Sequence, residues 1–226
     1  MKRLITITLI LFCSANLFAQ TGGQLTGEIT EFTGTVELKH PGSSDFVPAR
    51  AGDTLSANTL VSTGFRSTAI IKAGSTVLTV RPLTRLTLAE ISISSETEAV
   101  NVSLQTGRVR VDVNPPAGTR ANFTVQGPSS TASVRGTSFE FDTISLTVLE
   151  GEVVFHGANG GTYLVYANSS SEVNQFGRAE DPVEIYWAQL FPAPPAGSNT
   201  GFINSNVTGA GNLGPGADFE IGFELR

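Results

Sequence analysis

Carboxylates and histidines are the side chains of this sequence that could do chemistry, and neither kind forms a recognised catalytic pattern. Glu140, Asp142 and Glu150 could in principle supply the pair of carboxylates that a glycosidase uses. They alternate with apolar neighbours, however, which is typical of the solvated face of a β-strand. His40 and His156 are not spaced from other ligand-type side chains in a metal-binding pattern. We therefore predict no catalytic and no metal-binding residue.

Nucleotide binding and nucleophilic catalysis are also not indicated. The stretch 209–214 matches the glycine spacing of dinucleotide-binding loops, but it follows a Pro/Gly-rich segment rather than a strand. We interpret it as low-complexity sequence and predict no cofactor. The serines form no G-x-S-x-G elbow. Asp53 lies in a Gly52-Asp53-Thr54-Leu55 turn, where an aspartate can bond its own backbone. The chain is therefore not expected to be an enzyme.

The N-terminal 19 residues have the order of a secretory signal peptide. A basic start precedes an apolar run at 4–12, and small residues precede a cleavage site between Ala19 and Gln20. A membrane anchor is the nearest alternative, but it needs about 20 apolar residues. Lipidation at Cys13 is a weaker alternative, because bulky Phe12 stands where lipoprotein processing prefers a small residue.

Removal of this segment would change both the charge and the redox chemistry of the chain. It takes away Lys2 and Arg3, so the formal charge falls from −6 to −8, and it takes away the single cysteine. Stability would then come from core burial rather than from disulfides. An acidic protein repels phosphate backbones, so we expect no nucleic-acid partner. No later segment has the length and apolarity of a membrane span. The expected location is the periplasm, the cell surface or the medium.

Residues 20–176 have the alternation of short β-strands. Val100, Val102 and Leu104 share one parity with polar residues between them, and the same holds for 109–113 after a turn at Gly107. The strand spacing of about 8–12 residues is too short for crossover helices, which excludes a doubly wound α/β fold. We predict an all-β fold, a solenoid-like β-roll, with a two-sheet β-sandwich as the alternative.

Residues 180–191 predict a short helix that caps the open end of the β stack. Asp181 can cap its N-terminus, and a proline follows in the first turn. Four apolar residues are expected on one packed face, with Trp187 as its anchor: Val183, Tyr186, Trp187 and Leu190.

The C-terminal region changes composition. Residues 192–217 are rich in Pro, Gly, Asn and Ser, and we expect a mobile linker there. Residues 218–226 alternate again and predict one strand, which would add to the domain's own sheet edge or to that of a partner.

The buried parity changes between Val134 and Phe139. Such a flip predicts a bulge or tight bend at Gly136, where glycine tolerates positive φ and close backbone approach. Arg135 would hold that bend through a carbonyl or carboxylate, or would face a ligand; we favour the structural role.

Residues 52–155 resemble the extracytoplasmic domain of the FecR family. The resemblance rests on short pieces in a fixed order: Gly52-Asp53, Ser62 to Ala69 with Gly64 and Ser67, Thr76 to Leu88, Gly107-Arg108-Val109, Val134-Arg135-Gly136-Thr137 and Glu150-Gly151. It implies a non-catalytic β module in the periplasm or on the cell surface, in which these residues are structural.

The sequence departs from the sensor-type members of that family. Those members carry a cytoplasmic anti-sigma segment and a membrane-spanning helix ahead of this domain, whereas a signal peptide is expected here. The expected function is a binding or scaffold role in the bacterial cell envelope, with an unknown envelope protein or glycan as partner. The alternatives are a secreted carbohydrate-active enzyme of β-solenoid type and an accessory to a separate envelope-signalling regulator.

Overall fold

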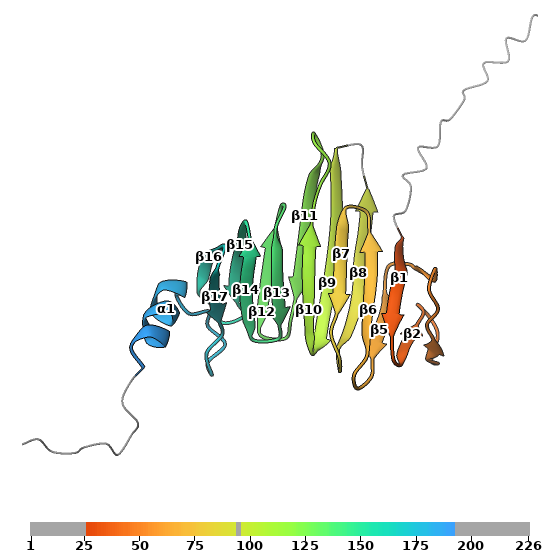
Figure 1. Ribbon diagram of the computed structural model, residues 1–226, viewed down its shortest axis with the longest axis horizontal. Helices are drawn as coiled ribbons and strands as arrows, with labels where there is room; N and C mark the ends of the chain where they lie inside the picture. Colours follow the sequence, from red (N-terminus) through yellow and green to blue (C-terminus); the bar gives the residue numbers. More distant parts are fainter. Residues whose placement is uncertain (1–25, 94–95, 193–226) are drawn as a thin grey trace, which may run out of the picture. The chain divides into compact units, whose positions relative to one another are not determined.

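The computed structural model describes residues 26–93 and 96–192, and the β domain within them belongs to a unit that ends at Leu190 (Figure 1). The expected cleavage site at Ala19 and Gln20, almost all of the expected linker and the expected terminal strand at 218–226 lie outside the described residues.

Two sheets account for nearly all of the described chain. In spatial order, the eight-stranded sheet contains β17 (Ser169–Glu172), β14 (Ser145–Glu150), β13 (Ser138–Asp142), β10 (Arg108–Val113), β7 (Thr76–Val80), β6 (Thr68–Ala73), β1 (Gly27–Thr33) and β4 (Thr54–Leu55). The nine-stranded sheet contains β16 (Thr162–Tyr166), β15 (Glu152–Gly157), β12 (Ser130–Val134), β11 (Arg120–Gln126), β9 (Thr97–Thr106), β8 (Arg85–Ile93), β5 (Thr59–Thr63), β2 (Val36–Lys39) and β3 (Val47–Pro48).

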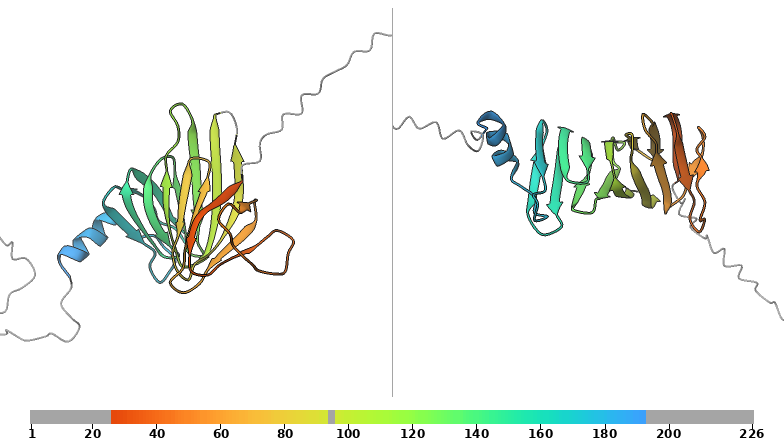
Figure 2. Two further views of the ribbon diagram at one scale, coloured as in Figure 1. Left: turned by 45° about the vertical axis from the view of Figure 1, so that its right-hand side comes forward. Right: turned by 90° about the horizontal axis from the view of Figure 1, so that it is seen from below.

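The chain moves back and forth between the two sheets while it advances along them. From β6 onward, strand order in each sheet follows chain order, as the colours of Figure 1 and the two views of Figure 2 show. Neighbouring strands are antiparallel, except that β9 and β11 run parallel. The all-β class is confirmed. The layers are those of the two-sheet alternative, and the steady advance is the property that suggested a roll.

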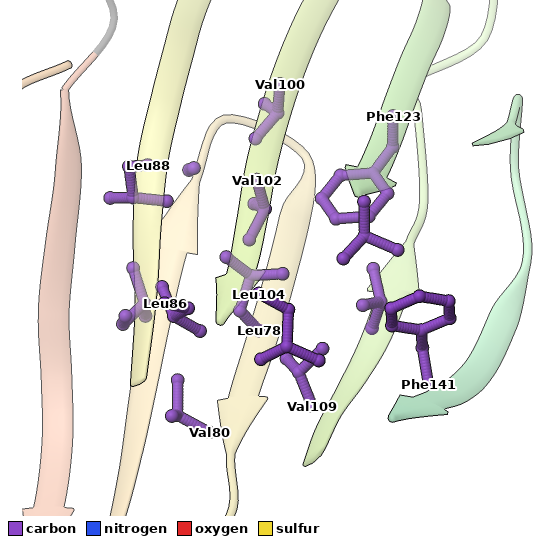
Figure 3. Close-up of a cluster of buried hydrophobic side chains, with 14 of the residues drawn as sticks. Leu78, Val80, Leu86, Leu88, Val100, Val102, Leu104, Val109, Phe123 and Phe141 are labelled. Atoms are coloured by element: carbon purple, nitrogen blue, oxygen red, sulfur yellow. The ribbon is translucent and has the colours of Figure 1, made fainter. Parts of the chain in front are cut away.

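The core lies between the sheets and is built from alternate residues of every long strand. Val100, Val102 and Leu104 of β9 are at most 2 % exposed, and their polar neighbours Asn101 and Ser103 face outward. Figure 3 shows such side chains gathered from both sheets. Each strand therefore has the buried and the wet face that its period of two predicts.

Two aromatic pairs join the sheets. Phe139 of β13 packs edge-to-face on Phe123 of β11 with ring centroids 6.0 Å apart, and Phe141 of β13 packs on Phe155 of β15 at 6.5 Å. All four rings are at most 1 % exposed. Both pairs therefore connect β13 of one sheet to strands of the other.

A single helix, α1 (Pro182–Leu190), is found among the described residues, and it packs against β17. Asp181 Oδ1 accepts a hydrogen bond from Val183 N at 2.8 Å, as an N-cap does. The predicted packed face is wrong. Its four residues are 51–59 % exposed, Trp187 among them, and Ile185 is the buried residue of the helix. Trp187 is therefore not a packing anchor.

Candidate functional site

At several points a very short connection that contains a glycine links a strand of one sheet to a strand of the other. Gly107 alone separates β9 in one sheet from β10 in the other, and its φ of +90° is open to glycine at little cost. A Cβ there would overlap Thr84 Oγ1 and lie 2.5 Å from Thr84 Cα. The expected turn at Gly107 is thus a crossing between sheets rather than a hairpin.

Buried hydroxyl groups hold these crossings together. Thr84 Oγ1 accepts a hydrogen bond from Arg108 N at 3.0 Å and lies 3.1 Å from Arg108 O, to which it can donate. Thr84 N donates to Thr63 Oγ1 at 3.0 Å. The pattern of apolar residues gave no signal for either threonine, because threonine is usually an ordinary polar residue of a strand face.

A glycine packed against a buried Ser or Thr recurs at two other crossings, although the hydroxyl of Thr137 at the first of them makes no hydrogen bond within the described chain. Gly151, with φ +80°, separates β14 from β15, and a Cβ there would lie 2.6 Å from Thr137 Cγ2. Gly34, with φ +73°, lies against Ser67, whose buried Oγ accepts a hydrogen bond from Thr35 N at 2.9 Å. Glu150 is exposed beside Gly151. Gly34 was not singled out from the sequence.

The two remaining N-terminal motif glycines have different surroundings. Gly52 has φ +88° in an exposed turn, and Asp53 Oδ2 accepts a hydrogen bond from Arg50 N at 2.7 Å, so the aspartate does bond the backbone of its turn. Gly64 lies close to Thr35, where a Cβ would be 3.3 Å from Thr35 O.

Of the two features expected at Gly136, a bulge or a tight bend, the structure has the bend, at residues 135–136. Gly136 lies between β12 and β13, so the change of buried parity arises because the chain passes from one sheet to the other. Its φ is not positive, and an added Cβ would meet only Pro115 Cδ at 3.6 Å and similar ordinary contacts. Other residues could therefore occupy this position.

Arg135, next to it, is exposed rather than bound to the bend. None of the hydrogen bonds or ion pairs found within residues 26–93 and 96–192 involves its guanidinium group. No contact of Arg135 with the bend is thus observed among the described residues, and its ligand-facing role stays a prediction.

Arg135 borders a groove of about 690 Å³ on the outer face of the nine-stranded sheet, which we call the Arg135 groove. Strand register places four of its outward residues in one row across β11, β12, β15 and β16: Thr124, Ser133, Val154 and Leu164. Val154 is 45 % and Leu164 42 % exposed. Asn122 and Glu152 also line the groove. None of the four residues in the row was singled out from the sequence, because the strand register that places them side by side has no local sequence signal.

The groove combines one unpaired cation with hydrogen-bonding and apolar surface. Arg135 can offer a planar fork of donors to a carboxylate. Thr124 and Ser133 lie 3.3 Å apart by their hydroxyl oxygens, and either can turn to a ligand. Val154 and Leu164 supply exposed apolar area. The arrangement can bind a segment that carries both an acidic and an aliphatic group, and it holds no nucleophile paired with a base.

Two of the three candidate carboxylates, Glu140 and Asp142, form ion pairs on the eight-stranded sheet. Glu140 Oε1 is 2.5 Å from Arg81 Nη2, and Asp142 Oδ2 is 3.2 Å from Arg108 Nη2. Their alternate neighbours Phe139 and Phe141 are buried. Glu140 and Asp142 are therefore outward strand residues, as expected, and each is paired with an arginine.

Hydrogen bonds hold the pKa of Asp142 below its usual value of 3.8. Partial burial is the largest single influence and acts in the opposite direction, but it is outweighed by donors from Ile144 N, Ser145 N, Ser145 Oγ and Arg108. On the same face, Asp112 raises the pKa of Arg110 by a side-chain hydrogen bond and by its charge.

The lowered pKa of Asp142 gives a testable dependence of stability on pH. Because the folded pKa lies below the unfolded one, the ionised carboxylate stabilises the fold above about pH 4, and this contribution is lost as the pH falls through the folded pKa. We expect Asp142→Asn to lower the free energy of unfolding by up to about 1 kcal/mol at pH 7, since solvent screens a partly exposed group. Urea denaturation at pH 7 and pH 3 measures this.

The control is Asp45→Asn, which removes a carboxylate that takes part in none of the ion pairs of the described chain. The difference in free energy of unfolding between Asp142→Asn and the wild type should be smaller at pH 3 than at pH 7. An equal difference at both pH values would show that lost packing, not lost charge, is responsible.

The histidines lie on β15 and just after β2. His156 Nδ1 lies 2.7 Å from Thr162 Oγ1 on the outer face of the sheet. In the part of the chain that the structure describes, no three His, Cys, Asp or Glu side chains gather to hold a metal ion. The search of those same residues also finds no helix long and apolar enough to cross a membrane.

The central part of the chain is similar to a known protein family. A family model described as FecR protein matches residues 59–154. The match contains Gly64, Ser67, Gly107, Arg135 and Gly151 and begins after Gly52 and Asp53. A comparison with curated proteins finds no match.

Two solved structures also align with the chain. Both are described as a "putative anti-sigma factor" from Parabacteroides distasonis, with 17 % and 18 % sequence identity and a TM-score of 0.44 in each case. The alignments cover 57 % of this chain and 63 % or 64 % of theirs, so the chain spans less than two thirds of those proteins.

Proposed function

Because the chain carries a FecR domain at residues 59–154, we propose that it is a non-catalytic binding protein of the bacterial cell envelope. The resemblance to extracytoplasmic domains and the signal-peptide pattern of residues 1–19 support export. The pairing of Glu140 and Asp142 with arginines supports a role without proton-transfer chemistry.

The partner that we propose is an envelope protein that places a carboxylate-bearing segment in the Arg135 groove. The observation that carries this proposal is the exposed guanidinium of Arg135, which has no ion pair in the described structure, beside the apolar surface of Val154 and Leu164. An acidic side chain next to an aliphatic one, as many protein segments have, satisfies both parts of this surface.

Photo-crosslinking in the native cell tests the proposal. A photoreactive amino acid in place of Thr124 lies in the groove, and mass spectrometry of the crosslinked species identifies the partner. We expect Arg135→Ala to weaken capture roughly ten- to a hundredfold, because a hydrogen bond between charged groups contributes about 1.5–3 kcal/mol.

A matched control separates the groove from general charge effects. Arg120→Ala removes another exposed arginine of the same sheet, one that does not line the groove. Capture should be unchanged in this variant. Equal loss in both variants, or unchanged capture with Arg135→Ala, would contradict the proposed site, and a crosslinked glycan would replace the protein partner by a sugar.

The FecR match also favours a narrower role, that of an accessory to a separate envelope-signalling regulator. Crosslinking distinguishes this role directly, because the captured protein would then be a membrane-bound regulator. A partner without a signalling segment would leave the broader binding role and remove the narrower one.

A further inference from the structure

The four edges of the two sheets are not equally protected. At one end of the described unit, β3 and β4 contain two residues each, and β3 includes Pro48. At the other end, α1 packs against β17. Short edge strands, prolines and covering helices are devices that prevent a sheet edge from pairing with another chain. β16 has five residues and contains no proline, so it is neither short nor proline-blocked.

The backbone of β16 is paired on one side. It forms a ladder with β15 from Glu152↔Tyr166 to His156↔Thr162. Among backbone hydrogen bonds outside the ladders, none within the described residues involves a residue of β16. An edge strand of this kind presents free N–H and C=O groups to any extended chain that lies beside it.

The side chains of β16 are suited to another strand. Thr162, Leu164 and Tyr166 point outward, and Leu164 and Tyr166 are 42 % and 59 % exposed. The strand carries no charge, and β-branched and aromatic residues have high β-propensity. An additional strand would therefore meet no unpaired charge on this edge.

The sequence of β16, Thr-Tyr-Leu-Val-Tyr, is complementary to itself when antiparallel. We propose that β16 pairs with β16 of a second copy of this chain about a two-fold axis at Leu164. Leu164 would then face its own symmetry mate, Tyr163 would face Val165, and Thr162 would face Tyr166. Aromatic pairs with β-branched residues are favourable cross-strand pairs, and a two-fold axis makes each contact occur twice.

Neighbouring residues agree with this register. Val154 lies opposite Leu164 in the ladder, so the dimer would bring two copies of each into one apolar row. Glu152 lies beside Tyr166 and His156 beside Thr162. Glu152 of one copy would therefore lie in the same row as His156 of the other copy, and no two carboxylates would face each other.

The dimer goes beyond the proposed binding role and adds a geometric consequence to it. Leu164 and Val154 also line the Arg135 groove. Two grooves would then lie next to each other across the new seam, on one continuous sheet. Such a surface can hold two copies of a partner segment, which raises the apparent affinity for a dimeric partner.

Sedimentation analysis of the purified chain from about 1 to 100 µM tests the dimer, since a small interface is expected to associate in the micromolar range. Leu164→Lys should weaken association at least tenfold, because two lysines would then face each other. The control is Val47→Lys, which adds the same charge at a site 41 % exposed on edge strand β3 of the same sheet and should leave association unchanged.

A charge exchange makes the test specific for the two-fold axis. Leu164→Lys and Leu164→Glu should each be monomeric alone and should form a mixed dimer when combined, while circular dichroism shows that both variants fold. A chain that is monomeric throughout, or a dimer unaffected by Leu164→Lys, would overturn the proposal. Loss of the dimer only on deletion of residues 193–226 would assign it to that segment instead.

Discussion

Gly107→Ala is expected to lower the free energy of unfolding by about 3 kcal/mol. About 1–2 kcal/mol comes from placing a residue with a side chain at φ +90°, and the remainder from overpacking. The new Cβ would lie 2.5 Å from Thr84 Cα and 2.8 Å from Leu83 O, and these backbone atoms cannot move without disturbing the crossing. Urea denaturation at pH 7 measures the change.

Gly118→Ala is the matched control for this prediction. Gly118 has a similar φ of +86°, but an added Cβ would meet no atom within 4 Å. It should therefore show the conformational cost alone, about 1–2 kcal/mol. If the two variants are equally destabilised, the close contact of the new Cβ with Thr84 does not contribute to the loss of stability.

Phe141→Ala should be still more damaging, with an expected loss of about 3–5 kcal/mol. Phe141 is fully buried, and its ring packs against Phe155 of the other sheet. A Cβ on Gly127 would be 3.3 Å from Phe141 Cζ, so the ring is enclosed on that side also. Truncation leaves a cavity that neither sheet can fill by moving alone. Thermal and urea denaturation report the loss.

Phe65→Ala provides the comparison for this core variant. Phe65 is 73 % exposed, and its ring lies near the guanidinium of Arg66. Its removal should change stability by no more than about 0.5 kcal/mol. A small effect of Phe141→Ala would mean that the core tolerates the cavity and that the aromatic pairs do not join the sheets energetically.

The period of two identified the buried residues because burial depends on which side of a strand a residue occupies. It could not identify the sheet to which a strand belongs. Between Val125 and Ala132 a hairpin changes the parity of the buried positions, and between Leu104 and Val109 a crossing does the same. The parity change at Gly136 was therefore interpreted as a bulge or tight bend within the strand pattern, whereas the bend found there takes the chain from one sheet to the other.

The helix shows a different limit of sequence reasoning. Its capping residue was predicted because Asp181 acts locally, through Val183 N. Its packed face was predicted wrongly, because the pattern of four apolar residues on one side of the helix pointed away from Ile185, the residue that is buried. A helix at the end of a β unit contacts little more than one strand, so a single buried residue can decide its orientation.

The Arg135 groove could be predicted only in part. The pattern singled out Arg135 and offered a ligand-facing role as one alternative. The row formed by Thr124, Ser133 and Val154 depends on the register of three strands, and no local pattern in the sequence fixes that register. Thr84 and Gly34 were missed for the same reason, because their roles arise from contact between distant crossings.

From β6 onward the chain adds each new strand to the growing end of one sheet or the other, and this order has a consequence for how the domain could change its length. From β8 onward, each strand pairs with strands no more than three places away in the chain, so its partners lie within a limited stretch of sequence. An array of this kind gains or loses stability in increments, one neighbour interaction at a time. Duplication or deletion of a whole hairpin with its glycine crossing would shift everything beyond it along the axis and leave the remaining contacts in register.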